Sequence, residues 1–187
     1  MKRIALLLAI LPCHAEPAAD PATVGPKIVA EASAKLLAEL TAAIAKDGPQ
    51  GAIAVCSERA PQIAAETGKA RGVVIRRAST KPRNPKNAAE ATERKTLETF
   101  AAAIEAKLPP QPQVIAAENG GKVFHAPILL ASPLCLQCHG NPERDITPAT
   151  LEALRKAYPA DQATGYTVGQ LRGLWSVTFA KDEELRN

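Results

Sequence analysis

The residues of this chain best suited to chemistry are Cys135, Cys138 and His139, which lie in the sequence CLQCH. Two cysteines two positions apart, followed at once by a histidine, are the attachment signature of a c-type haem. Each thiol can add to one vinyl group of the porphyrin, and the histidine is then placed to bind the iron from the proximal side. The pattern occurs once in the chain. We therefore expect one covalent haem c.

Two other interpretations of this motif remain open. A CxxC pair can be a dithiol redox centre, and together with Cys56 the motif would supply a Cys3His set for zinc. A thioredoxin-like centre requires the pair at the start of a helix within a βαβ pattern. Here the sequence Gly140-Asn141-Pro142 follows the motif and disfavours a helix that continues from it. We favour haem over both alternatives.

The amino terminus predicts export. Residues 1–15 contain two cations, an apolar run from Ile4 to Leu11 and a small residue, Ala15, at a candidate cleavage site. This pattern is typical of a secretory signal peptide and is too short to span a bilayer. Residues 16–25, rich in proline and alanine, are expected to be a leader, and residues 26–187 to form one haem domain. Periplasmic localisation suits c-type haem, which is attached outside the bacterial cytoplasm.

Removal of residues 1–15 leaves few strong iron ligands. The only methionine is Met1, so the His/Met ligation common in cytochromes c is excluded. With His139 on the proximal side, the distal ligand is Cys56, His125, a weaker group such as lysine or water, or nothing. Cys56 is otherwise an unpaired thiol in an exported protein, or a small buried apolar residue. A metal lowers the pKa of a thiol strongly, and we favour Cys56.

Other residues are candidates for holding the porphyrin. The arginines at positions 76, 77, 83 and 172 suit the propionates, because guanidinium groups bind carboxylates well. Arg83 is preferred among them, since it lies in a loop flanked by prolines. Trp175 is a candidate for packing against the porphyrin, although a tryptophan on a strand is also an ordinary core residue.

Hydrophobic periodicity predicts an α+β fold. Helices are expected over 26–47, 50–59, 88–108 and 149–157, with a break at Gly48-Pro49. Strands are expected over 72–77, 114–117, 122–130 and 173–180, the second and third joined by a turn at 119–121. In the last strand, Trp175, Val177 and Phe179 alternate with polar residues, which predicts a half-buried strand. We expect helices packed on one side of an antiparallel sheet.

Several segments together resemble a known family. The segments are residues 54–56 (AVC), 60–64 (APQIA), 77–87 (RASTKPRNPKN), 135–140 (CLQCHG), 158–166 (YPADQATGY) and 171–177 (LRGLWSV). In this order they resemble the exported single-haem c-type family with a PAS-like fold, long catalogued as a domain of unknown function. The resemblance covers nearly all of the chain after the signal peptide. It implies an antiparallel sheet of about five strands flanked by helices, and iron ligation by His139 and Cys56.

The charge and hydropathy of the chain exclude some classes of function. The formal net charge of +4 falls to +2 without Lys2 and Arg3, and no basic tract remains, so nucleic acid is not an expected partner. No later segment has the length and hydropathy of a membrane span. The resemblance implies redox sensing or low-potential electron transfer with a separate redox or signalling protein. The alternative is a sensor of NO or CO in which the Cys56 ligand is displaced. An enzyme such as a peroxidase would need His125 as its acid-base group, and we expect no enzymatic activity.

Overall fold

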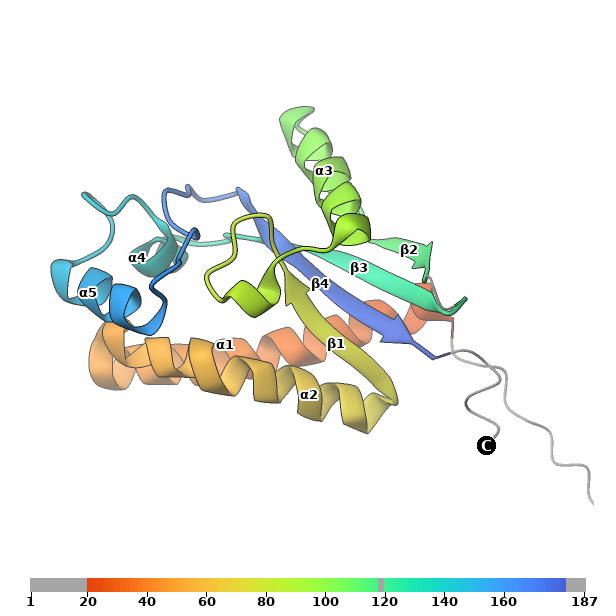
Figure 1. Ribbon diagram of the computed structural model, residues 1–187, viewed down its shortest axis with the longest axis horizontal. Coiled ribbons are helices and arrows are strands. Elements are labelled where there is room, and N and C mark those ends of the chain that lie inside the picture. Colours follow the sequence, from red (N-terminus) through yellow and green to blue (C-terminus); the bar gives the residue numbers. More distant parts are fainter. Residues whose placement is uncertain (1–19, 118–119, 181–187) are drawn as a thin grey trace, which may run out of the picture.

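The computed structural model describes residues 20–117 and 120–180, which form an antiparallel sheet with helices on both faces (Figure 1). The strands lie in the order β1-β4-β3-β2. Their bounds are β1 (Val73–Ala78), β2 (Gln113–Ala116), β3 (Lys122–Leu129) and β4 (Leu171–Phe179). The helical segments are α1 (Pro21–Ala54), the π-helical η1 (Val55–Arg59), α2 (Ala60–Arg71), the 3₁₀ turns η2 (Pro85–Asn87) and η3 (Pro133–Cys135), α3 (Ala91–Glu105), α4 (Leu136–His139) and α5 (Pro148–Ala157).

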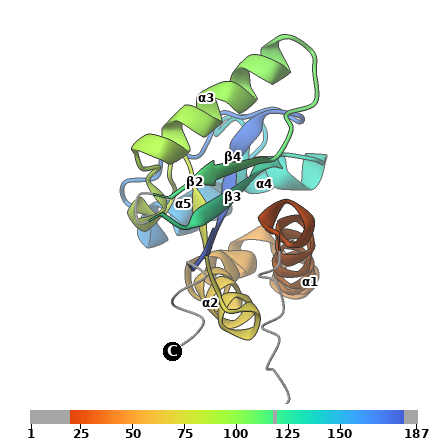
Figure 2. The ribbon, with the colours of Figure 1, turned by 90° about the vertical axis from the view of Figure 1, so that its right-hand side faces the viewer.

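The predicted α+β class is confirmed, but two details of the prediction are wrong. The described residues form four strands instead of about five. These are the four stretches whose sequence has a strand pattern, and a fifth was implied only by the resemblance. The helices also cover both faces of the sheet: α1 and α2 lie on one face and α3 on the other (Figure 2).

Strand β4 explains why both faces need helices. It pairs with β1 on one side and β3 on the other, so it is central. Trp175 and Val177 are buried towards α1 and α2, whereas Leu174 is buried towards α3. Ser176, expected to face solvent, is also buried. A strand with apolar side chains on both faces is stable only when both faces are covered. The half-buried pattern expected from the alternation is therefore wrong at Ser176.

Helix α1 begins at Pro21 and not at Pro26. The Asp20 side chain accepts a hydrogen bond from the backbone N–H of Ala22 at 3.3 Å, and Pro21 occupies the first turn, where its missing N–H is tolerated. Residues 20–25, expected to be leader, thus belong to the fold. Gly25 allows this start, because a Cβ there would lie 2.4 Å from the Phe124 ring. The expected signal peptide (1–15) and residues 16–19 lie outside the described residues.

The predicted break at Gly48-Pro49 is present as a kink. Gly48 has φ of +72°, outside the helical region, and the helix resumes after it. The chain then passes through the π-helical turn η1 into α2, whose first turn contains Pro61. The kink at Gly48 therefore precedes Cys56 by a few residues, and Cys56 itself lies in the π-helical turn. Within residues 20–117 and 120–180, no helix is both long enough and apolar enough to cross a bilayer.

The segments between β3 and β4 form the end of the molecule that contains the CxxCH motif. Helices α4 and α5 lie beyond one end of the sheet, next to the later part of α1 (Figure 1). Helix α5 is capped by Thr147, whose hydroxyl accepts from the Thr150 N–H at 3.2 Å. Ile53 of α1 packs with Ile146, Leu154 and Tyr158 in a small core of its own. This core fixes the motif against α1.

Candidate functional site

The three residues of the motif line one cavity. Turn η3 and helix α4 wrap Cys135, Cys138 and His139 into consecutive helical turns, and Gly140 ends the helix in an extended conformation. The expectation that no helix continues from the motif is confirmed. Both thiols and the imidazole contribute to the wall of a cavity between α1, the sheet and this segment. The three cysteines at positions 56, 135 and 138 are free thiols.

The orientation of His139 is fixed by the backbone. Its Nδ1 lies 2.8 Å from the carbonyl oxygen of Ala163, which can only accept, so Nδ1 carries the proton. The Nε2 lone pair then remains available to a metal, as in most metal-binding histidines. Burial, together with the cations Arg83, Arg172 and Arg77, holds the pKa of His139 well below its usual value, which keeps the imidazole neutral. Tyr166 packs edge-on against its ring, with centroids 6.3 Å apart.

Cys56 lies in the wall of the same cavity, on the π-helical turn η1. Single π-helical turns in otherwise regular helices occur frequently at functional sites. Burial raises the pKa of the Cys56 thiol, whereas the positive charges of Arg77, Arg83 and Arg172 act to lower it. The structure thus brings Cys56 and His139, more than eighty positions apart in the chain, to one cavity.

Zinc is not favoured by this arrangement. Among the described residues, no three His, Cys, Asp or Glu side chains come together as a group that could hold a metal ion. The expected alternative of a Cys3His zinc site formed with Cys56 is therefore not assembled. The cavity wall instead includes the apolar side chains of Leu40, Ile44 and Leu134.

Arg83 lines the cavity but is held by protein groups. Its Nε donates to Asp161 at 3.0 Å, and its Nη2 donates to the carbonyl oxygens of Cys138 and Ala163. The residue is 7% exposed. Arg83 therefore joins the motif to the loop that follows α5. The proline-flanked loop was a correct signal for a residue at the cavity, but its bonding partners had no signal in the sequence.

Arg77 and Arg172 line the cavity without a carboxylate partner among the described residues. The guanidinium carbon of Arg77 lies 5.8 Å from the centroid of the Trp175 ring. Arg172 stacks at the same distance over Tyr166 and donates to the hydroxyl oxygen of Ser79. Burial lowers the pKa of both arginines, which marks sites where a cation lacks a full shell of water.

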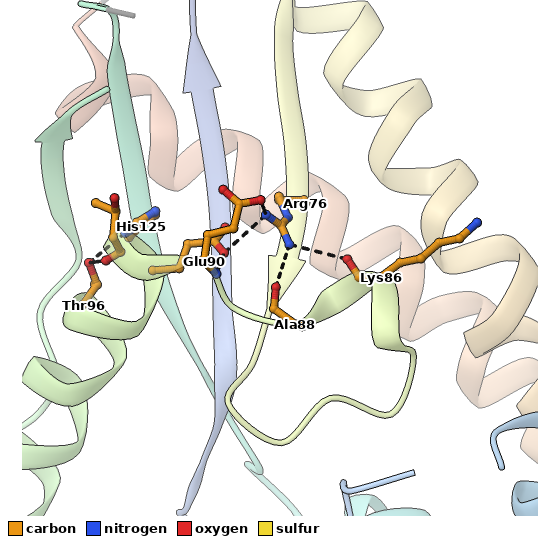
Figure 3. Close-up of polar contacts among 8 residues, drawn as sticks. Arg76, Lys86, Ala88, Glu90, Thr96 and His125 are labelled. Carbon is orange, nitrogen blue, oxygen red and sulfur yellow. Dashed lines mark hydrogen bonds and ion pairs between the residues drawn. The ribbon is translucent and has the colours of Figure 1, made fainter. Parts of the chain in front are cut away.

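Arg76 and Trp175 lie outside the cavity wall. Arg76 forms ion pairs with Glu90 and Glu93 and donates to the carbonyl oxygens of Lys86 and Ala88 (Figure 3). Trp175 is 5% exposed in the core under α1 and α2, and does not line the cavity. Its contact with the cavity is indirect, because it stacks on Arg77.

His125 lies on the other side of the sheet from the cavity-side helices. Its Nδ1 lies 2.9 Å from the hydroxyl of Thr96 in α3, and its side chain is 1% exposed (Figure 3). It does not line the cavity. His125 is therefore excluded as a distal ligand and as the acid-base group of a peroxidase, two roles left open by the sequence.

The buried position of His125 predicts a pH dependence of stability. Burial lowers its pKa to about 4, below the ordinary value of 6.5. The unfolded chain then binds more protons between these values, so stability is lost as the pH falls from 7 to 4. The loss at this one residue is expected to be about 3 kcal/mol. Denaturant unfolding of the wild type and His125→Gln at pH 7 and pH 4 measures it.

Comparing the loss of free energy of unfolding between pH 7 and pH 4 in the two proteins isolates His125 from the other titrating groups. The wild type is expected to lose more free energy of unfolding between these pH values than His125→Gln does. Any loss of the Thr96 hydrogen bond in the variant is the same at both pH values and cancels. Equal losses in the two proteins would contradict the prediction.

Some features of the cavity had no signal in the sequence. The carbonyl of Ala163 that orients His139 is a backbone group, and so any residue type would serve. Leu37 and Leu129 line the cavity, yet are 56% and 38% exposed, so the wall includes apolar surface open to solvent. Tyr158 also lines it, from the end of α5. An apolar group of considerable size would cover these side chains.

The fold and cavity define a class of protein: an α+β domain in which a CxxCH motif, a distant cysteine and several arginines enclose an apolar cavity. The chain belongs to the Tll0287-like family, whose model matches residues 26–180. The family resemblance predicted from the sequence motifs is thereby confirmed.

A solved structure has the same fold. The crystal structure of the cyanobacterial heme-protein Tll0287 has a TM-score of 0.67 and 23% sequence identity to this chain, and the similarity covers 87% of this chain and 98% of that one. No curated protein sequence matches the chain.

Proposed function

We propose that this protein binds one haem c covalently through Cys135 and Cys138, with His139 and Cys56 as the iron ligands. The observation that carries the proposal is the presence of these four side chains in the wall of one largely apolar cavity. The hydrogen bond from His139 to Ala163 supports it, because this bond leaves Nε2 free to bind iron. The similar cyanobacterial structure is described as a heme-protein.

Two further properties of the cavity wall fit a haem: its apolar surface and its positive charge. Leu37, Leu129 and Ile128 offer apolar surface, part of it exposed, for the face and edge of the porphyrin. The buried Nε of Arg172 has no hydrogen-bond partner among the described residues, in a cavity with an excess of cations. Burying a cation in this way is costly unless an anion is bound. A porphyrin with carboxylate groups supplies both the apolar surface and the anions.

The ligand set supports a low-potential redox role. When bound, a haem supplies an iron that gains and loses one electron. A thiolate from Cys56 would stabilise the ferric state, because it adds a negative charge beside the iron. Arg83 and Ala163, which help to hold the site, are both buried and are joined by a hydrogen bond. We propose redox sensing or low-potential electron transfer in the periplasm, with a separate redox or signalling protein as partner and without enzymatic activity.

Mass spectrometry tests covalent attachment. Protein expressed with a working haem c maturation system is expected to be heavier than its polypeptide by one haem. The Cys135→Ser/Cys138→Ser variant is expected to lose this mass completely, because it has no thiol to form a thioether. Cys56→Ser is the matched control and should keep the mass, since its thiol binds iron without a covalent bond to the porphyrin. A wild-type mass equal to the polypeptide alone would refute the proposal.

A further inference from the structure

The cavity contains two arginines that form no ion pair with an acid among the described residues. Arg77 and Arg172 form no ion pair among the described residues, whereas the third cation of the cavity, Arg83, is paired with Asp161. The positive charges of Arg83 and Arg77 both act to lower the pKa of Arg172, and the opposing effect of Asp161 is smaller than either, so the guanidinium groups are near enough to repel one another. Two cations that repel in a partly buried site require anions from elsewhere.

The contacts of both arginines are to neutral groups. Arg77 stacks on the Trp175 ring. Arg172 stacks on Tyr166 and donates through Nη1 to Ser79 and to the carbonyl oxygen of Lys81. These contacts position the guanidinium groups but leave their charge uncompensated. The buried Nε of Arg172, which lacks an acceptor within the described residues, is a donor still available to a ligand.

Cys56 does not supply the missing negative charge, because as an iron ligand its thiolate would be matched by the positive charge of ferric iron. With Asp161 bound to Arg83, two guanidinium groups are left for the two carboxylates that a haem carries.

We propose that Arg77 and Arg172 bind the carboxylate groups of the haem. Arg83 instead joins the CxxCH motif to the loop that follows α5. This inference rests on the proposed haem function. The two arginines are on β1 and β4, which are neighbouring strands, so the sheet sets their positions before the cofactor arrives. Guanidinium groups held in place by aromatic stacking are well suited to bind carboxylates.

Resonance Raman spectroscopy of the holoprotein tests the assignment. The bending vibration of the haem propionates depends on their hydrogen bonds. It is expected to shift to lower frequency in Arg77→Gln and in Arg172→Gln. The reduction potential should fall in both variants, because a nearby cation favours the reduced iron. Arg77→Lys, which keeps the charge and loses the paired donors, should shift the vibration but largely retain the potential.

Arg76→Gln is the matched control. Arg76 is adjacent to Arg77 on the same strand, but its charge is paired with Glu90 and Glu93 outside the cavity, so both readouts should stay at their wild-type values. If a glutamine variant fails to fold, the Lys variants at positions 77 and 172 decide the question by the same vibration. An unchanged vibration in haem-loaded variants at both positions would overturn the inference. A wild type without covalent haem would refute the proposed function instead.

Discussion

Replacing Cys56 by serine is expected to change the ferric absorption spectrum and to raise the reduction potential by on the order of 0.1 V. Serine keeps the size of the side chain but remains a neutral, weakly binding hydroxyl. Loss of the thiolate removes a negative charge that favours ferric iron. Covalent haem should still be present, because Cys135 and Cys138 are unchanged. Spectra with and without dithionite, and a potentiometric titration, measure both effects.

His125→Gln is the control for this experiment. His125 is buried against Thr96 on the face of the sheet covered by α3 and does not line the cavity. Its replacement is therefore expected to leave the spectrum and the potential unchanged. If instead the Cys56 variant kept the wild-type spectrum while the His125 variant lost it, the ligand assignment would have to be abandoned.

The sequence predicted which residues of the motif meet at one site better than it predicted their surroundings. Cys135, Cys138 and His139 are adjacent in the chain, so their spacing alone implies a common ligand. Cys56 was a candidate ligand because the sequence offers few strong alternatives, and the structure places it in the wall of the same cavity. Arg77 and Arg76 could not be distinguished, although one lines the cavity and its neighbour does not. In a strand, adjacent side chains point to opposite faces, and the sequence did not reveal which face the cavity occupies.

The same limit applies to the fold. Four strands were located to within a few residues, because short β-branched runs bounded by turn residues are specific signals. The covering of both faces was missed, since Ser176 suggested a solvent-facing side for β4. In the structure Ser176 is 4% exposed and pairs across the sheet with His125, whose ring contacts Thr96 of α3. The start of α1 was missed because Asp20-Pro21 and Pro26 are both suitable helix starts.

Replacing Arg83 by methionine is expected to destabilise the protein by about 3–5 kcal/mol. The guanidinium and the Asp161 carboxylate are both largely buried, with side chains 8% and 12% exposed, so the variant leaves an unpaired carboxylate in the interior. It also removes the donor to the carbonyls of Cys138 and Ala163. Denaturant unfolding of the holoprotein measures the loss.

Two comparisons separate the buried pair from a general effect of losing an arginine. Arg59→Met removes the surface ion pair with Glu39, whose side chains are more than a third exposed, and should cause a much smaller loss. In the double variant Arg83→Met/Asp161→Asn, the unpaired charge is gone. Its loss should therefore be smaller than the sum of the two single losses. Additive losses would mean that the two side chains act independently.

The loss of Arg83 should also affect His139, because a short chain of hydrogen bonds connects the two residues. Asp161 accepts a hydrogen bond from the Ala163 N–H at 2.7 Å, and the Ala163 carbonyl in turn accepts from His139 Nδ1 at 2.8 Å. Loss of Arg83 loosens the loop that presents this carbonyl, so the imidazole is held less firmly. The haem-loaded Arg83→Met variant should therefore show a broadened ferric spectrum even under conditions where it is fully folded. A spectrum identical to the wild type would confine the role of Arg83 to stability.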